Sequence, residues 1–559
     1  MSPEPRSSPS LDEVFWKGYS ISSRSGGIPI DEYDMIVRGV SRCSTKLKIP
    51  FARTNITRAQ PQCRRFATPA AGTPTASSSG SAAGMLAPFA NELDKIAPSF
   101  SINGSQIQII RTPADFYETL KERIRNAKRR IFLSTLYIGK TEKELIATLH
   151  EALRNNPELK LSILTDALRG TREEPNPSCA SLLAPLVAEF GADRVEIRMY
   201  HTPNLTGLRK KYIPKRINEG WGLQHMKLYG VDDEIILSGA NLSSDYFTNR
   251  QDRYHLFSSK EVTDYFWNIH HGVSSFSFLV EPSKEPAGFA LTWPKSNPAP
   301  SPLKEPKQFI GTTTPALDAL ISPRQAASAD AGKDTKVYML SQLTQLMSPN
   351  TSTELPAVTH VLSTLGKPEY AGSSWTFTAG YFNPAPSLTK LLLSTASQNN
   401  VVITASQQAN GFYQSPGVSG LLPGAYTLLA RRFVRAVHER KLDDSIALKE
   451  WRKGTIGEPG GWTYHAKGLW ITLPGEQNPS ISIVGSSNYT KRSYTHDLEA
   501  GAMILTKDED LKKRLGEEQT WLQDHAERVT REDFSKNERR VGIQVRIAMW
   551  IAQAVGGAL

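Results

Sequence analysis

The chain has 559 residues, of which 39% are hydrophobic and 22% are charged, as is typical of a soluble or peripheral globular protein with two or more domains. No run of about 18 apolar residues occurs, so a transmembrane helix is not expected. The formal net charge of +11 favours anionic partners, whether phosphates, nucleic acid or an acidic membrane. The three cysteines form neither a zinc-binding pattern nor a disulfide framework.

The N-terminal region has the composition of a targeting sequence. No acidic residue occurs between Asp34 and Glu92, whereas Arg, Lys, Ser, Thr and Ala are frequent. This composition is typical of a mitochondrial presequence, and Arg64-Arg65-Phe66-Ala67 resembles a cleavage site. Because residues 1–34 are rich in acidic side chains, we hypothesise that Met35 is the biological start; an intact Met1 on N-terminal sequencing would contradict this. The alternative is a disordered basic tail.

The rest of the chain alternates between helical and extended patterns. In the first half we predict helices at 113–128, 141–155 and 181–190 and strands at 130–137, 159–165 and 195–200. In the second half we predict strands at 374–379 and 401–405 and helices near 386–394 and 423–438. This alternation predicts an α/β fold in which each half is a mixed sheet covered by helices.

Composition and pattern divide the chain into five parts. They are 1–90 (presequence and flexible linker), 91–285 (first α/β domain), 286–335 (insertion or linker rich in Pro, Ala and Ser), 336–505 (second α/β domain) and 506–559 (C-terminal helices). In the last part, residues 541–555 are apolar, but they are too short to span a membrane comfortably and Arg546 interrupts them. We predict an interfacial helix with Trp550 near lipid head groups or, alternatively, a terminal helix packed on the core.

Two short histidine–lysine signatures indicate an internal duplication. Each is followed by an asparagine and then, eleven positions later, by a carboxylate. The members are His225, Lys227, Asn241 and Asp252 in the first copy and His465, Lys467, Asn488 and Glu499 in the second. The same residue types at matching offsets predict that the two halves are related copies.

These residue types suit attack on a phosphodiester or pyrophosphate. Such a substrate repels nucleophiles, so its non-bridging oxygens need cations and hydrogen-bond donors, which the two lysines and two asparagines supply. It also needs a nucleophile and a separate acid/base, and two histidines can divide these roles. We predict that Asp252 and Glu499 each hydrogen-bond an imidazole and set its tautomer. Because the lysines provide positive charge, no metal ion is demanded.

The duplicated pattern resembles the phospholipase D superfamily, with its H-x-K-x4-D and G-x-N motifs. The resemblance implies two phospholipase D-like halves with the active site between them, a covalent phosphohistidine on one histidine and a second histidine that protonates the leaving group. It also implies a catalytic role for Asp232, which completes the first motif. The matching position of the second copy is Thr472, which puts the equivalence of the halves in doubt. We favour His225, whose motif is complete, as the nucleophile and His465 as the acid/base.

The flanking segments resemble the eukaryotic phosphatidylglycerophosphate synthase branch more specifically. They are Ser134–Gly139, Asp166–Arg172, Gln224–Gly230, Ala409–Tyr413, Gly417–Tyr426, Tyr464–Trp470 and Arg492–Glu499. The resemblance implies transfer of the phosphatidyl group of CDP-diacylglycerol to glycerol 3-phosphate, with release of CMP, in cardiolipin and phosphatidylglycerol synthesis.

The same resemblance implies partners and a location. The partners are the two substrates and the anionic inner mitochondrial membrane, with the enzyme peripheral on the matrix side and no nucleic acid bound. It implies no cofactor and leaves open whether a divalent cation assists at the diphosphate.

Two further features carry weaker predictions. Arg169 and Arg172 follow a predicted strand, where α/β sheets usually bind ligands, so we predict that they hold a phosphate of the acceptor or the nucleotide, or else are solvated surface residues. The Gly-rich, aromatic segment 409–426 is predicted to be a lid or a lipid-facing edge, or else a packed loop.

Two other functions are compatible with the signatures. A nuclease or tyrosyl-DNA phosphodiesterase would use the same residues on nucleic acid, as the positive charge favours, but no basic, aromatic-interleaved stripe lies near the motifs. A catalytically inactive lipid-binding scaffold is favoured only by Thr472. CMP release that depends on glycerol 3-phosphate would separate these three functions.

Overall fold

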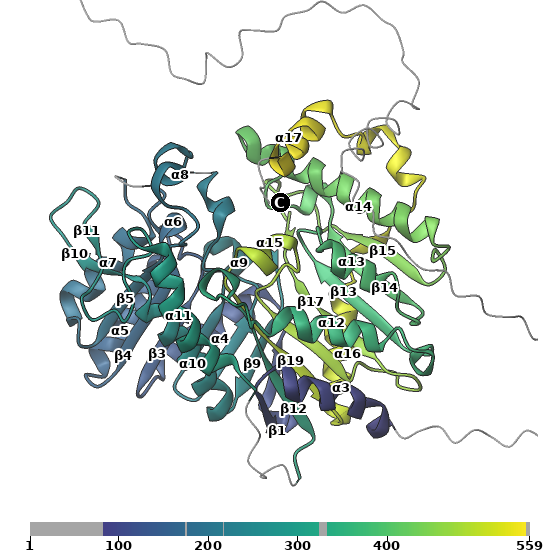
Figure 1. The fold of residues 1–559 in the computed structure, drawn as a ribbon, viewed down its shortest axis with the longest axis horizontal. Coiled ribbons are helices and arrows are strands. Elements are labelled where there is room, and N and C mark those ends of the chain that lie inside the picture. Colours follow the sequence, from purple (N-terminus) through teal and green to yellow (C-terminus); the bar gives the residue numbers. More distant parts are fainter. Residues whose placement is uncertain (1–81, 174–175, 216, 324–331, 555–559) are drawn as a thin grey trace, which may run out of the picture. The chain divides into compact units, whose positions relative to one another are not determined.

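The structure is a computed structural model that describes residues 82–554, except 174–175, 216 and 324–331. The predicted presequence, its cleavage site and Met35 lie outside the described residues. Two nine-stranded sheets, which belong to one compact unit, organise the described part of the chain (Figure 1).

The first sheet has the strand order β11-β10-β5-β4-β3-β6-β7-β9-β2. Its strands are β2 (Ile107–Ile110), β3 (Arg130–Ser134), β4 (Lys160–Asp166), β5 (Val195–Tyr200), β6 (Leu228–Val231), β7 (Glu234–Ser238), β9 (Tyr254–Ser258), β10 (Phe278–Pro282) and β11 (Phe289–Thr292). Strands β3, β4 and β5 are parallel, and the other neighbouring pairs are antiparallel.

The second sheet has the strand order β1-β12-β19-β18-β17-β13-β14-β15-β20. Its strands are β1 (Ser99–Ile102), β12 (Thr335–Gln342), β13 (Ser374–Ala379), β14 (Asn400–Ala405), β15 (Ile446–Trp451), β17 (Lys467–Thr472), β18 (Ile481–Gly485), β19 (Glu499–Thr506) and β20 (Ala526–Arg528). The run β15-β14-β13-β17-β18-β19 repeats the run β5-β4-β3-β6-β7-β9 of the first sheet, with three parallel strands followed by antiparallel ones. The shared topology supports the predicted duplication.

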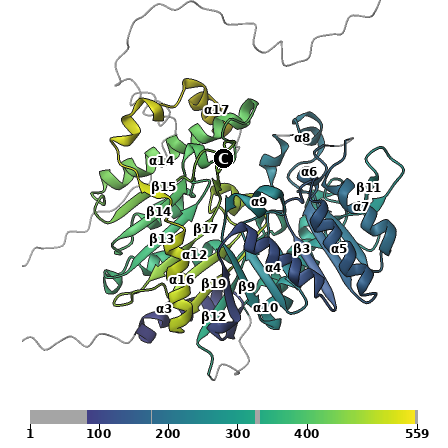
Figure 2. The same ribbon diagram turned by 180° about the vertical axis from the view of Figure 1, so that it is seen from behind.

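Helices cover both faces of each sheet, as the strand–helix alternation predicts (Figure 2). The first sheet packs against α4 (Pro113–Arg125), α5 (Lys143–Asn155) and α7 (Cys179–Phe190) on one face and against α10 (Lys260–Ser275) and α11 (Pro306–Ile321) on the other. The second packs against α3 (Ala82–Ile96), α12 (Glu354–Thr364), α13 (Pro386–Leu392) and α14 (Leu422–Glu439) on one face and against α16 (Glu509–Trp521) on the other. Strand alternation explains this, since Ile131 and Leu133 face α4 while Phe132 faces α10.

A buried ionic cluster ties the two halves together. Arg253, which immediately precedes β9, lies 2.8 Å from a carboxylate oxygen of Glu518 on α16, and Nε2 of His255 lies 2.9 Å from the other oxygen. The indole of Trp470 on β17 donates to the same carboxylate at 3.0 Å. Although burial opposes ionisation, Arg253 and His255 lower the pKa of Glu518 to about 2. The ion pair between Arg253 and Glu518 therefore forms only when the first half and α16 pack together.

The domain boundaries differ from the sequence prediction at three places. The predicted linker 286–335 contains β11 and α11, and Phe309, Leu317 and Ile321 of α11 are completely buried. Residues 82–90, predicted as flexible, begin α3, whose Phe89 is buried against the second half. Strand β1, assigned to the first domain, pairs with β12 of the second sheet. Small residues and prolines in 68–90 and 286–335 led to the linker predictions, because tertiary burial is not visible in local composition.

The C-terminal part, predicted as helices, contains α16, the short strand β20 and α17 (Ile543–Ala554). Val545 and Met549 of α17 pack on Ala425 of α14. No helix among the described residues is long and apolar enough to cross a membrane.

Candidate active site

The two signature histidines occupy equivalent positions where the sheets meet. His225 lies just before β6, and His465 lies between the short strand β16 (Thr463–Tyr464) and β17. The backbone N–H of each histidine donates to a carbonyl of the other half, at 2.9 Å from His225 to Leu498 and at 2.8 Å from His465 to Gln251. Because Leu498 and Gln251 each precede a signature carboxylate, the two halves clamp each other's histidine in the same way.

Each imidazole is hydrogen-bonded by a carboxylate of the opposite half. Nδ1 of His225 lies 2.9 Å from both oxygens of Glu499, and Nδ1 of His465 lies 2.7 Å from Oδ2 of Asp252. Both carboxylates are buried. A carboxylate on Nδ1 holds the proton there and leaves the Nε2 lone pair for chemistry. The sequence identified these four residues but not that their pairing is crossed between the halves.

The two lysines lie directly beside the histidines. Nζ of Lys227 donates to the carbonyl of His225 at 2.6 Å, and Nζ of Lys467 donates to the carbonyl of His465 at 3.0 Å. Nζ of Lys467 also lies 2.8 Å from Nδ1 of His465, 3.2 Å from Nε2 of the same ring and 3.8 Å from Asp252. Burial lowers the pKa of Lys227 to about 7 and that of Lys467 to about 8. An anionic ligand between them would stabilise their charged forms.

Burial also sets the protonation of the other members of the site. Burial and the neighbouring lysine lower the pKa of each histidine well below its usual 6.5, and burial raises the pKa of Glu499 to about 7 and also raises that of Asp252. Both imidazoles are therefore neutral near pH 7. A neutral imidazole can act as a nucleophile or accept a proton.

Each signature asparagine has a buried amide oxygen without a hydrogen-bond partner among the described residues. Oδ1 of Asn241 and Oδ1 of Asn488 are buried and have no hydrogen-bond partner within the described part of the chain. Nδ2 of Asn241 donates to the hydroxyl of Tyr246 at 3.2 Å, and this hydroxyl lies 3.4 Å from Nε2 of His465. Buried amide groups without partners are uncommon, and here they lie in matching positions of the two halves.

Comparisons with known proteins place the chain in a family. A family model described as "Cardiolipin synthase, PLD-like domain" matches residues 120–271. CDP-diacylglycerol–glycerol-3-phosphate 3-phosphatidyltransferase of Saccharomyces cerevisiae is 45% identical over 82% of this chain and 92% of its own length. The protein of the same name in Schizosaccharomyces pombe is 41% identical over 78% and 92%. The chain belongs to this phosphatidyltransferase family.

More distant relatives extend the likeness. The human member of the family, whose name includes "mitochondrial", is 33% identical over 81% of this chain and 83% of its own length. Among solved structures, phosphatidylserine synthase of Haemophilus influenzae Rd KW20 superimposes with a TM-score of 0.64 and 19% identity, covering 84% of this chain and 97% of that one. The superposition shows a shared fold.

The structure places Asp232, predicted to be catalytic, away from the site. It lies in the turn between β6 and β7, where its carboxylate accepts hydrogen bonds from the backbone N–H groups of residues 128, 129 and 130 at 2.7–3.1 Å. Its φ of 51° is one that Asp tolerates better than most residues. Thr472 ends β17 opposite Ser374, equally far along its strand from the histidine. The incomplete second motif therefore concerns a strand end and leaves the catalytic groups unchanged.

A real asymmetry lies instead at the position two residues before each asparagine. A Cβ on Gly239 would lie 2.7 Å from Asp252 and 2.8 Å from Nζ of Lys467, so only glycine lets these two groups approach. The equivalent residue of the second half is Ser486, whose hydroxyl donates to Glu499. The two histidine–carboxylate pairs are thus supported by different third groups, a lysine for Asp252 and a serine for Glu499.

The predicted phosphate-binding arginines follow β4, with Arg169 in the short helix α6 (Ala167–Gly170) and Arg172 just after it. Arg172 forms an ion pair with Glu219, and Nη1 of Arg169 lies 3.7 Å from the same carboxylate. The guanidinium of Arg169 also lies over the ring of Tyr137, at the wall of a cavity of about 320 Å³. Glu219 balances only one of the two positive charges of Arg169 and Arg172. Binding of a substrate phosphate by these arginines stays a prediction.

Several site residues were not found from the sequence. The rings of Tyr246 and Tyr381 pack edge-on against His465, with centroids 5.2 and 5.3 Å away. Tyr426, within the predicted lid 409–426, stacks on Tyr381 at 5.4 Å. Asp166 and Asp497 accept the backbone N–H groups of Gln224 and Leu223, at 2.9 and 3.1 Å, and so fix the segment before His225. Isolated Tyr and Asp residues carry no periodic signal, so only the three-dimensional arrangement reveals them.

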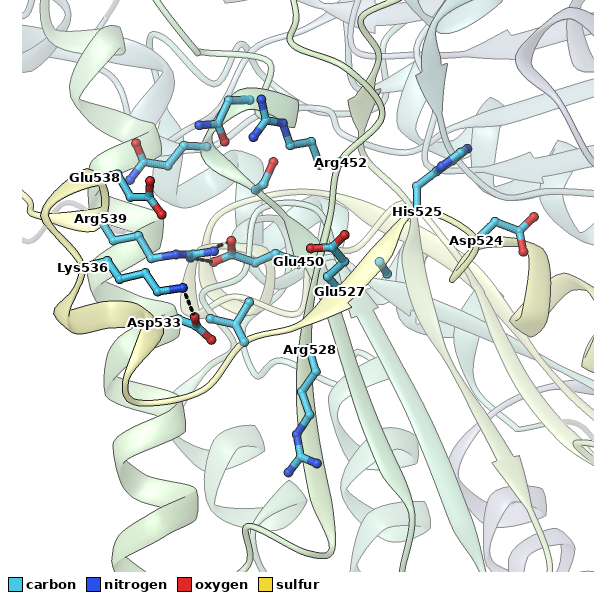
Figure 3. Close-up of a pocket in the computed structure, with 15 residues that line it drawn as sticks. Glu450, Arg452, Asp524, His525, Glu527, Arg528, Asp533, Lys536, Glu538 and Arg539 are labelled. Atoms are coloured by element: carbon cyan, nitrogen blue, oxygen red, sulfur yellow. Dashed lines mark hydrogen bonds and ion pairs between the residues drawn. The ribbon is translucent and has the colours of Figure 1, made fainter.

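Other polar features lie apart from this site. A cavity of about 550 Å³ under the C-terminal segment is lined by side chains of both signs, with ion pairs of 2.7 Å from Arg539 to Glu450 and 2.8 Å from Lys536 to Asp533 (Figure 3). These pairs neutralise each other, and the cavity contains none of the signature residues. In the described ranges, no group of three or more His, Cys, Asp or Glu side chains is arranged to hold a metal ion.

Proposed function

We propose that the chain transfers the phosphatidyl group of CDP-diacylglycerol to glycerol 3-phosphate, giving phosphatidylglycerophosphate and CMP. The observation that carries this proposal is the crossed pair of histidine–carboxylate contacts between two lysines, in a chain whose relatives are named for this reaction. Two neutral imidazoles suit a two-step transfer better than a single displacement, because each step needs one of them.

In the first step His225 acts as the nucleophile. Its Nε2 makes no hydrogen bond to another described residue, whereas Nε2 of His465 has the Tyr246 hydroxyl at 3.4 Å and Nζ of Lys467 at 3.2 Å. The Nε2 lone pair forms a bond to the phosphorus of the phosphatidyl group, and the bond from that phosphorus to the bridging oxygen of CMP breaks. CMP leaves as a phosphate monoester, whose second pKa of about 6 makes a proton unnecessary. A phosphatidyl-histidine remains.

In the second step His465 acts as the general base. Nε2 of the neutral imidazole removes the proton of the 1-hydroxyl of glycerol 3-phosphate, and Asp252 stabilises the resulting imidazolium through Nδ1–H. The alkoxide oxygen bonds to phosphorus, and the phosphorus–nitrogen bond breaks, so that its electron pair returns to His225. Lys227 and Lys467, together with the Nδ2 donor groups of the two asparagines, hold the non-bridging oxygens throughout.

Trapping the intermediate tests the division of roles. The protein is incubated with CDP-diacylglycerol labelled in the phosphatidyl phosphate, without acceptor, and quenched in alkali. We expect label on His225 in the wild type, accumulation of label in His465→Asn even when glycerol 3-phosphate is added, and none in His225→Asn. His438→Asn, at an exposed histidine of α14, is the matched control. Label on His465 would contradict the order of the two histidines.

We also propose that the chain works at the matrix side of the inner mitochondrial membrane, as a peripheral protein that supplies cardiolipin synthesis. The mitochondrial names of the mammalian relatives and the outward face of α17 support this. Ile543, Ile547 and Trp550 of this helix are 72%, 51% and 68% exposed, although its other face is packed on α14. Deleting residues 541–559 should weaken the binding of the protein to anionic vesicles, and unchanged binding would contradict a role for α17.

A further inference from the structure

The exposed apolar side chains of the described residues are confined to two regions. The large hydrophobic residues with high exposure are Leu208, Tyr212, Ile217, Val418, Ile543, Ile547 and Trp550. The first three belong to the first half, in and after α8 (Gly207–Tyr212), and the others belong to the second half, before α14 and on α17. Both regions rise to the same upper edge in the two views (Figures 1 and 2).

The α8 region has the character of a surface that awaits a partner. None of the residues of α8 is buried, and Leu208 and Tyr212 stand four positions apart, on one face of the helix, with exposures of 74% and 69%. A helix of six residues gains little stability from its own hydrogen bonds and usually depends on packing. The apolar face of α8 is mostly exposed in the described part of the chain, so it adds little stability to the fold. Three consecutive basic residues, at positions 209–211, lie between the two apolar ones.

The base of this protrusion is anchored next to the catalytic histidine. The hydroxyl of Thr202 and the amide of Asn204 both donate to the carbonyl of Trp221, at 3.3 and 3.4 Å, and close a loop over residues 205–220. Arg492 of the second half donates to the carbonyl of Glu219 at 3.0 Å. His225 follows four residues after Trp221, so the loop that carries α8 ends next to this histidine in the chain.

The second apolar region is joined to the other histidine in a comparable way. Helix α17 packs on α14, and Tyr426 near the start of α14 stacks on Tyr381, which packs edge-on against His465. Val418, 72% exposed, belongs to the turn that leads into α14. The two apolar regions therefore belong to different halves, and each is connected to the segment around one of the paired histidines.

We propose that α8 and Ile217 form a second membrane-binding element, which together with α17 seats both halves of the enzyme on an anionic bilayer with the catalytic site between the two contacts. The inference deepens the proposed function, on which it rests for the lipid nature of the substrate. A bilayer suits this surface because α8 contains no acidic side chain and three basic ones. Lysine is depleted in protein–protein interfaces, whereas lysine and arginine beside apolar groups are favoured at anionic lipid surfaces.

Vesicle flotation with full-length variants tests the proposal. Vesicles of phosphatidylcholine, with and without phosphatidylglycerol, are compared for the wild type, for Leu208→Ser/Tyr212→Ser/Ile217→Ser and for Lys210→Glu/Lys211→Glu. Each basic residue near an anionic surface contributes about fivefold to binding, so the charge variant should lose at least about 25-fold on phosphatidylglycerol vesicles only. The apolar variant should lose at least about tenfold on these vesicles. Lys507→Glu/Lys513→Glu, which makes the same charge change at exposed positions in and just before α16, should bind as the wild type does.

A second measurement separates this surface from catalysis. With CDP-diacylglycerol dispersed in detergent micelles, the α8 variants should keep the CMP release of the wild type, because their changes lie outside the catalytic groups. Vesicle binding unchanged in both α8 variants would overturn the proposal, as would a change of oligomeric state on gel filtration, which would assign the surface to a protein partner. Failure of the wild type to release CMP from micelles would refute the proposed function. Vesicle binding is measured without substrate, so its result tests the membrane-binding surface independently of that function.

Discussion

Replacing Gly239 with alanine should disable the active site without unfolding the protein. A Cβ at this position would lie 2.7 Å from Oδ1 of Asp252 and 2.8 Å from Nζ of Lys467, roughly 0.6–0.7 Å closer than an ordinary contact of 3.4 Å. Asp252 is held by His465 at 2.7 Å and by the backbone N–H of Arg253 at 2.9 Å, so it cannot retreat alone. The imidazole of His465 should therefore move with its carboxylate by several tenths of an ångström.

The size of the effect follows from this displacement. A misplacement of about 1 Å at a catalytic group costs about 100-fold in rate, so a smaller shift should lower kcat by about 10- to 100-fold. This range corresponds to about 1.4–2.7 kcal/mol of lost transition-state stabilisation. Gly239 does not have a positive φ, so alanine fits its backbone conformation and the melting temperature should change little.

The assay is glycerol 3-phosphate-dependent release of CMP from micellar CDP-diacylglycerol, with the melting temperature measured in parallel. Ser486→Ala is the matched control, because position 486 already carries a Cβ and loses only one hydroxyl, which is worth about 0.5–1.5 kcal/mol. Its kcat should therefore fall by about tenfold at most. The reasoning is refuted if Gly239→Ala keeps kcat within about threefold of the wild type, or if Ser486→Ala is the more damaged of the two.

Three further results are expected. The pKa values of the two buried lysines, about 7 and about 8, mean that their charge is lost as pH rises, so kcat/KM for CDP-diacylglycerol should fall through this range. The acid limb should lie near pH 7, the pKa of Glu499, because its ionised carboxylate orients His225, whereas the lowered pKa of each histidine places its own protonation at lower pH. A rate that keeps rising above about pH 8 would contradict the role of the lysines. Asp232→Asn should reduce the free energy of unfolding by about 1–3 kcal/mol, and Thr472→Asp should leave kcat within about twofold; a large loss of kcat in folded Asp232→Asn would return that residue to the catalytic group. Glu518→Gln should reduce the free energy of unfolding by about 3–5 kcal/mol near pH 7, because Arg253 stays buried without its counterion. The pKa of Glu518 falls from 4.5 to about 2 on folding, so its ionic contribution to stability is complete above pH 4.5 and is lost as pH decreases toward 2. Denaturant titrations in which Glu518→Gln loses as much free energy of unfolding near pH 2 as near pH 7 would disprove this.

The sequence was sufficient to predict the elements that depend on a local pattern of residues. Helix α4 matches its prediction because Phe116, Leu120 and Ile124 recur on one face, and all three are buried. Strands β5 and β13 begin and end at the predicted residues, since short β-branched and aromatic runs bounded by polar segments leave little choice. Two offsets recur in both copies, two positions from histidine to lysine and eleven from asparagine to carboxylate, because each copy is one contiguous segment that forms neighbouring strands of its sheet.

Features that depend on contacts between distant parts of the chain could not be predicted from the sequence. Helix α11 was missed because its Pro, Thr and Ala residues have the composition of a linker, although Phe309 and Leu317 are fully buried by distant elements. Likewise, Tyr246 and Tyr381 contact His465 from other parts of the chain, and no local spacing connects them to it. The crossing of the carboxylates is the clearest case, because either half alone contains every residue type and neither contains a complete histidine–carboxylate pair.

This crossing explains why the two halves can differ in sequence without ceasing to work as one site. Each histidine is oriented by the other half, so neither half can perform a step independently, and strict equivalence of the motifs is not required. The replacement of Asp by Thr472 is harmless on this view, because its counterpart, Asp232, supports a turn. The difference between Gly239 and Ser486 matters more, since it brings a lysine to one histidine–carboxylate pair and a hydroxyl to the other. Two chemically unlike histidines are what a transfer through a covalent intermediate needs, because one must attack phosphorus and the other must accept a proton.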